Sequence, residues 1–137
     1  MTRWKRVRLL VAWLLGLYLA HMYVRMGWIK FDPHGFWTGA FERWGYPVWL
    51  RVSVGWVEVV GGAMLIVPWT ATAGGLAVAA VMGGAWLTRY LDGRYVDVAW
   101  ISGYLVALLW IAYEWREFAF WRRRQNHGLS ARRKTTQ

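Results

Sequence analysis

Long apolar runs separated by short polar segments dominate the pattern of this 137-residue chain. Four such runs cover residues 8–28, 47–67, 70–90 and 96–115. Each run has the roughly 20 residues that an α-helix needs to cross about 30 Å of hydrocarbon, at about 1.5 Å per residue. The sequence therefore predicts an all-α, integral membrane four-helix bundle, with residues 1–121 forming a single four-span domain.

The segments between the runs predict how the helices connect. Pro68-Trp69-Thr70 joins the second and third runs as a tight turn, with Thr70 available as the N-cap of the next helix. The first connection is longer, and its Asp32-Pro33 pair is a helix-start signal. The apolar residues that follow on one helical face are Phe36, Trp37, Ala40, Phe41 and Trp44. We expect a short amphipathic helix at the outer membrane interface, or alternatively a lid over a site between the spans.

Charge supports this reading and orients the chain. Seventeen Lys and Arg residues against seven Asp and Glu give a formal net charge of +10. The basic residues gather before the first run and after the last, which is typical of cytoplasmic segments. The pattern predicts cytoplasmic N- and C-termini, a basic and disordered cytoplasmic tail over residues 122–137, and the lipid bilayer rather than nucleic acid as partner.

Composition changes the picture in three ways. Thirteen Trp residues lie mostly near the predicted ends of the spans, as in an aromatic belt. No Cys is present, which excludes disulfides, thiolate metal sites and thiol redox relays from this chain. Three glycine pairs predict close approach of the second and third spans to their neighbours. These pairs are Gly61-Gly62, Gly74-Gly75 and Gly83-Gly84.

One carboxylate, Glu58, falls inside the second run at about 16 Å below its outer edge. Arg51, Gly55, Glu58 and Gly62 are spaced to share one face of a helix. A charged group at that depth is costly, so it marks a candidate functional site. The alternative is that Glu58 only fixes helix packing, either protonated or paired with an arginine.

Other polar residues are predicted at similar depth. His21 and Arg25 in the first run, Arg51 in the second and Tyr104 in the fourth are expected to converge with Glu58 in the outer half of the bundle. The alternative for the arginines is that they extend to the outer headgroups. A single His and a single Glu make a poor metal site, so no metal is predicted.

Several short motifs follow one another along the chain, namely Gly27-x-x-Lys30, Gly45-Tyr46-Pro47, Gly55-x-x-Glu58-x-x-Gly61-Gly62 with Leu65 and Pro68, and Met82-Gly83-Gly84-Ala85. Their order and spacing resemble the DoxX family of small four-helix bacterial membrane proteins, over about residues 8–115. The family is similar to DoxD-type membrane subunits of thiosulfate:quinone oxidoreductase. The resemblance implies a bacterial inner-membrane location, Lys30 and Glu58 as family-like polar positions, and a quinone-linked or redox-associated role.

Three functions remain open at this stage. The first is a redox-associated membrane subunit that has no intrinsic cofactor and binds a quinone. In this case Glu58 transfers a proton or forms a hydrogen bond to a quinone carbonyl, and His21 and Tyr104 are its candidate partner residues. The second is a non-enzymatic accessory subunit that packs against a larger membrane complex. The third is a small transporter or lipid-binding protein, which four spans without an inverted repeat make less favoured. Membrane or redox partner proteins, or self-association, are expected in the first two cases.

Overall fold

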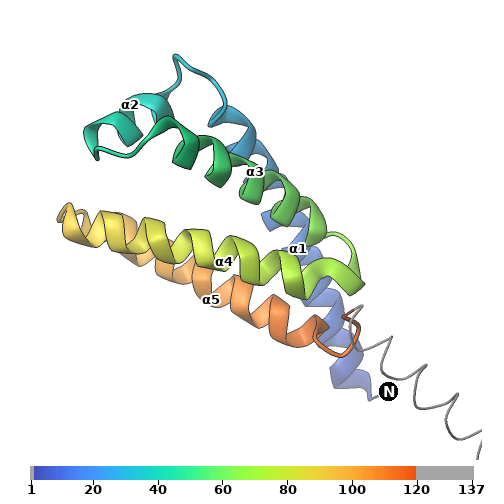
Figure 1. Ribbon diagram of the computed structural model, residues 1–137. Coiled ribbons are helices and arrows are strands. Elements are labelled where there is room, and N and C mark those ends of the chain that lie inside the picture. The colour runs from blue at the N-terminus through green and yellow to red at the C-terminus, as the bar shows by residue number, and fades with distance from the viewer. Residues whose placement is uncertain (1, 120–137) are drawn as a thin grey trace, which may run out of the picture.

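The computed structural model describes residues 2–119, and these form helices without a strand (Figure 1). The helices are α1 (Arg3–Ile29), α2 (Phe36–Arg43), α3 (Val48–Met64), α4 (Pro68–Leu91) and α5 (Tyr95–Trp115). The all-α prediction is confirmed over this part of the chain, and the tail predicted for residues 122–137 lies outside it. We call the end that carries α2 and the α4–α5 turn the α2 end, and the other the opposite end.

Three of the helices are long and apolar enough to cross a membrane, by length and composition. They are α1, α4 and α5, which match three of the four predicted spans. The fourth, α3, has 17 residues, so it rises only about 26 Å and is shorter than the predicted 47–67 run. Its last predicted turn is lost because the chain turns after Met64 to begin α4.

The α3–α4 turn differs from the prediction in how its helix is capped. α4 begins at Pro68, whose fixed φ and missing N–H suit the first helical position. Thr70 therefore lies inside the first turn of α4 and is not its N-cap. Its hydroxyl donates instead to the carbonyl oxygens of Met64 (2.9 Å) and Val67 (3.2 Å), which ties the end of α3 to the start of α4.

The helix predicted in the first connection is present as α2. Ala40 and Phe41 are buried, while Phe36 is 66% exposed and so does not join the packed face. Gly45 ends the segment with φ +73°, where the amide of Tyr46 donates to the carbonyl of Phe41 at 2.9 Å. This left-handed position favours glycine and lets α3 start immediately afterwards.

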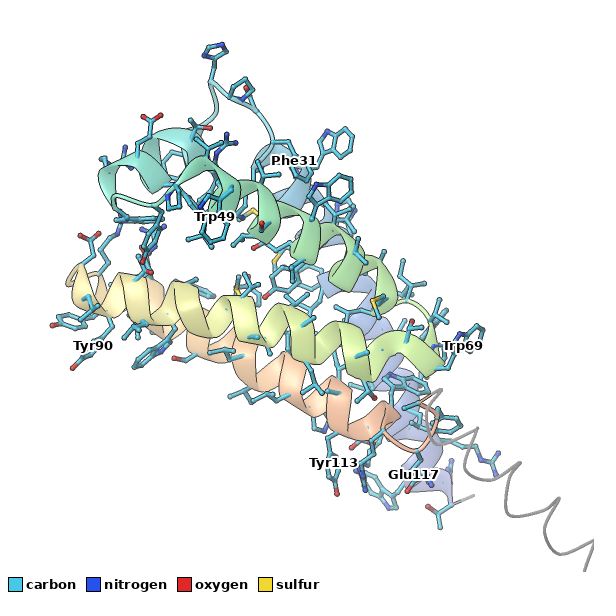
Figure 2. All side chains as sticks on the ribbon, viewed as in Figure 1. Phe31, Trp49, Trp69, Tyr90, Tyr113 and Glu117 are labelled. Carbon is cyan, nitrogen blue, oxygen red and sulfur yellow. The ribbon has the colours of Figure 1, made fainter. Side chains whose placement is uncertain are left out.

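The helices pack in the pairs α1 with α3, α3 with α4, and α4 with α5, while α1 also reaches α5. Figure 2 shows aromatic side chains at both ends of α4, with Trp69 at its start and Tyr90 near its end. At the opposite end, Arg8 of α1 pairs with the buried Glu114 of α5. The ion pair joins the first and last helices.

The three glycine pairs divide into two groups. A Cβ at Gly74 would lie 2.6 Å from the carbonyl oxygen of Gly61, and a Cβ at Gly62 would lie 3.0 Å from the Cβ of Tyr23. These glycines allow the close approach that was predicted for them. For Gly83 and Gly84 the prediction is wrong, because no atom of the described residues lies within 4 Å of either built Cβ. The difference arises because α3 and α4 diverge toward the α2 end (Figure 1).

Candidate functional site

The site forms where two small-residue faces meet along α1 and α3. Gly27 of α1 lies against Gly55 of α3, where a Cβ on Gly27 would be 2.6 Å from the Gly55 carbonyl oxygen. Near the opposite end, a Cβ on Gly16 would lie 3.2 Å from the carbonyl oxygen of Leu65. This close backbone approach brings the polar side chains at the α2 end of the interface within reach of each other.

Lys30 and Glu58 form a buried ion pair across this interface. Lys30 Nζ lies 2.7 Å from Glu58 Oε2, and the side chains are only 4% and 2% exposed. Helical side chains lean toward the N-terminus of their own helix, and α1 and α3 run in opposite directions. The two side chains therefore lean toward each other, so a lysine one residue past α1 reaches a carboxylate in the interior of α3.

Lys30 is also the point where three helices meet. Its Nζ lies 4.1 Å from the centre of the Trp37 ring of α2, and it donates to the Met26 carbonyl of α1 at 3.4 Å. The buried guanidinium of Arg51 in α3 donates to the Lys30 carbonyl oxygen. Burial lowers the pKa of Lys30, and the Glu58 carboxylate opposes that shift. The site is thus an ion pair screened from water and covered by an aromatic ring.

The structure brings together three of the six sequence-predicted residues, namely Glu58, Lys30 and Arg51. His21 and Arg25 have exposed side chains and do not join this group. Their positions follow from helix geometry, since His21 is nine residues from Lys30 and Arg25 is five, which turns both to the far side of α1. The partner of Glu58 is accordingly a lysine, and Arg25 plays no part in the pair.

Tyr104 lies deeper in the bundle and contacts a residue that the sequence reasoning missed. Its half-buried ring packs edge to face against Tyr23 of α1, with ring centres 6.5 Å apart. Tyr23 is 2% exposed, and its hydroxyl is the one buried side-chain polar atom of the described residues without a hydrogen-bond partner. The sequence spacing could have predicted this position, because Tyr23 precedes Gly27 by four residues and Lys30 by seven and so lies on the same face of α1.

The arrangement offers hydrogen-bonding and proton-handling groups inside an apolar bundle. Among residues 2–119, no group of three or more His, Asp or Glu side chains is placed to hold a metal ion. The polar groups of the site are the Lys30 ammonium, the Glu58 carboxylate, the Arg51 guanidinium and, deeper in the bundle, the Tyr23 phenol, and such groups can bind the carbonyl or hydroxyl of a ligand.

Long apolar helices enclosing a buried ion pair place the protein in the class of helical membrane proteins. Within that class, the model of the DoxX-like family matches residues 14–112, and the chain belongs to this family. The match runs from within α1 to within α5, and residues 14–112 include both Lys30 and Glu58. In the searches of curated proteins and of solved structures, nothing matched the chain significantly.

Proposed function

We propose that the protein crosses the bacterial inner membrane four times, with both termini cytoplasmic. Support comes from the basic residues in the first two turns of α1, and from α3, which runs from the α2 end back to the start of α4 (Figure 1). Single cysteines in the Cys-free chain test this proposal with an impermeant thiol reagent on intact cells. Cysteine at His34 should be labelled, whereas cysteine at position 2 or 135 should not. Labelling at position 2 or 135 would contradict the topology.

We further propose that the protein is a quinone-linked membrane subunit of a redox system. The observation that carries the proposal is the buried Lys30–Glu58 pair, which is covered by Trp37 and lies between long apolar helices. Charged groups inside membrane helices are costly and are retained mainly where they bind a ligand, carry a proton or pair with each other.

The residues present suit a quinone. A quinone offers two carbonyl acceptors on a flat apolar ring, and the site offers the ammonium of Lys30 and the unpartnered hydroxyl of Tyr23 as donors. The rings of Trp37 and Tyr104 supply flat apolar surface close to these donors. A quinone, when bound, supplies the redox chemistry, while Glu58 and Lys30 position it and hold or release a proton.

The experiment is identification of the bound small molecule. The protein is purified in a mild detergent, and its extractable quinone is quantified by mass spectrometry. We expect quinone in the native protein and a loss of about tenfold in Glu58→Gln, which corresponds to about 1.4 kcal/mol of binding free energy. The control is Glu42→Gln, which changes an exposed carboxylate of α2. Quinone-free native protein would contradict the proposal.

A second candidate is a non-enzymatic accessory subunit of a larger membrane complex. The observation in its favour is that Lys30 and Glu58 already satisfy each other, as a purely structural link would. Recovery of a stoichiometric complex without a bound small molecule would favour this candidate over the first.

A further inference from the structure

One side of α4 packs against α3 at Gly74 and becomes open toward the α2 end, at Gly84. Gly74, Ala77, Val81, Gly84 and Thr88 follow at helical spacing and share an arc of about 80° on α4. Gly74 is packed tightly against α3, whereas no described atom lies within 4 Å of a Cβ built on Gly84. Ala77 and Gly84 are exposed and Val81 is half-buried. We call the segment from Ala77 to Gly84 the open stretch.

The open stretch lies between two contacts that join the α1–α2–α3 part to α4. The first is the glycine contact of α3 and α4 toward the opposite end, where Gly74 meets Gly61. The second lies at the α2 end, where the Tyr46 and Thr88 hydroxyls are 2.7 Å apart and the Arg89 guanidinium lies 4.8 Å from the Trp44 ring centre. Between them α3 and α4 diverge (Figure 1). The two contacts join α4 to the α1–α2–α3 part on either side of the open stretch.

The unpartnered Tyr23 hydroxyl is an independent observation that points to a ligand. The Tyr23 side chain lies against Gly62 of α3 and Tyr104 of α5, and it belongs to the same core cluster as Val78 of α4. Val78 directly follows Ala77, where the open stretch begins. A buried donor without an acceptor destabilises the protein, so an acceptor that reached the Tyr23 hydroxyl would be bound favourably.

We infer that a lipid-phase quinone enters the bundle between α3 and α4 across the open stretch, and that the Tyr23 hydroxyl donates a hydrogen bond to its carbonyl. This inference rests on the proposed function and adds to it the route and the anchoring donor. Entry from the lipid suits a ligand whose apolar tail stays in the bilayer while its ring reaches the core.

The test uses a benzoquinone with a decyl tail as probe and the full chain in lipid nanodiscs. Equilibrium binding is measured with radiolabelled probe, and the association rate by quenching of tryptophan fluorescence. Tyr23→Phe should weaken binding by about two- to tenfold, as expected for the loss of one hydrogen bond. Tyr113→Phe is its control, because Tyr113 points away from the bundle (Figure 2).

Gly84→Trp tests the route, since an indole at this position occupies the open stretch. It should slow association by about tenfold, as when binding first requires a conformational change. Gly103→Trp is the matched control, because its built Cβ also meets no described atom, and it adds the same fluorophore on α5. It should leave the association rate unchanged.

The outcomes separate this inference from the proposed function. If the native protein does not bind the probe, the proposed function fails and the inference with it. If the native protein binds but Tyr23→Phe and Gly84→Trp behave like their controls, only the inference is overturned. Thermal unfolding of each variant shows whether it is folded. If Gly84→Trp lowers the unfolding temperature, its association rate no longer reports on the route alone, and the Tyr23→Phe result decides the inference.

Discussion

The two sides of α3 contact their neighbours in different ways. Toward α1, contact continues from Leu65, which meets Gly16, to Arg51, which bonds the carbonyl of Lys30. Toward α4, the close backbone contacts lie at the opposite end, around Gly61 and Gly74. The first side combines close backbone packing with a buried ion pair, whereas the second leaves part of α4 uncovered. The difference indicates that α1 and α3 pack as one unit, and the α3–α4 side is the one across which we propose that a ligand enters.

The contrast also separates two uses of polar groups in the bundle. Between α1 and α3, Lys30, Glu58 and Arg51 are buried and each bonds to a group across the interface, so they fix the relative position of the two helices. At the α2 end of α4, Tyr46, Thr88 and Arg89 form contacts that are exposed or only partly buried. Exposed contacts of this kind contribute little energy and can open without leaving a buried charge unpaired.

The largest expected effect comes from breaking the ion pair on the fixed side. Lys30→Met removes the cation but leaves Glu58 buried, which should lower the free energy of unfolding by about 3–5 kcal/mol. The measurement is reversible unfolding in mixed micelles. Changing both residues, as Lys30→Met with Glu58→Leu, should recover much of the loss, because a buried pair replaced by apolar side chains is often close to neutral.

Activity or ligand binding in the double variant then separates the two roles of Glu58. A stable double variant that has lost quinone binding supports a functional carboxylate, and a stable one that keeps it supports a structural link. If Lys30→Met alone unfolds like the native protein, Glu58 does not depend on Lys30, and α1 and α3 are not held as argued above.

Much of the fold could be predicted from the sequence, because apolar runs and basic flanks report directly on helices of spanning length. The spacing of Arg51, Gly55, Glu58 and Gly62 also predicted one shared face of α3, and the structure buries all four of these residues. The facing side of α1 was harder to identify. The polar residues His21 and Arg25 were predicted to face inward. The inward face is instead formed by Gly16, Gly27 and the aromatic Tyr23. Polarity alone does not tell an inward side chain from an exposed one.

Two further features depend on tertiary packing and could not be read from the local sequence. Trp37 covers Lys30 because of the way α2 folds back over the end of α1. The predicted apolar stripe also contains Phe36, which is exposed, and the stripe alone does not tell which of the two aromatic rings covers Lys30. The glycine pairs look alike in sequence, but only those near the crossing of α3 with its neighbours are packed. Helix divergence, which decides between them, is a property of the whole bundle.

The smaller predicted effect compares two glycines on the same side of α4. Gly74→Ala places a methyl group 2.6 Å from both the Gly61 carbonyl oxygen and the Met64 Cβ, so α3 and α4 must separate. We expect a loss of about 1–3 kcal/mol in unfolding free energy, the usual effect of overpacking a close contact. The same unfolding assay in mixed micelles measures it.

Gly84→Ala is the matched variant, because it makes the same chemical change where a Cβ meets no described atom. It should stabilise the helix by about 0.5–1 kcal/mol, since alanine loses less backbone entropy than glycine on helix formation. Opposite signs at the two positions would establish that the α3–α4 side is packed at one end and open along the rest. Equal losses at both would mean that α4 packs along its whole length in the membrane, leaving a ligand no path between α3 and α4.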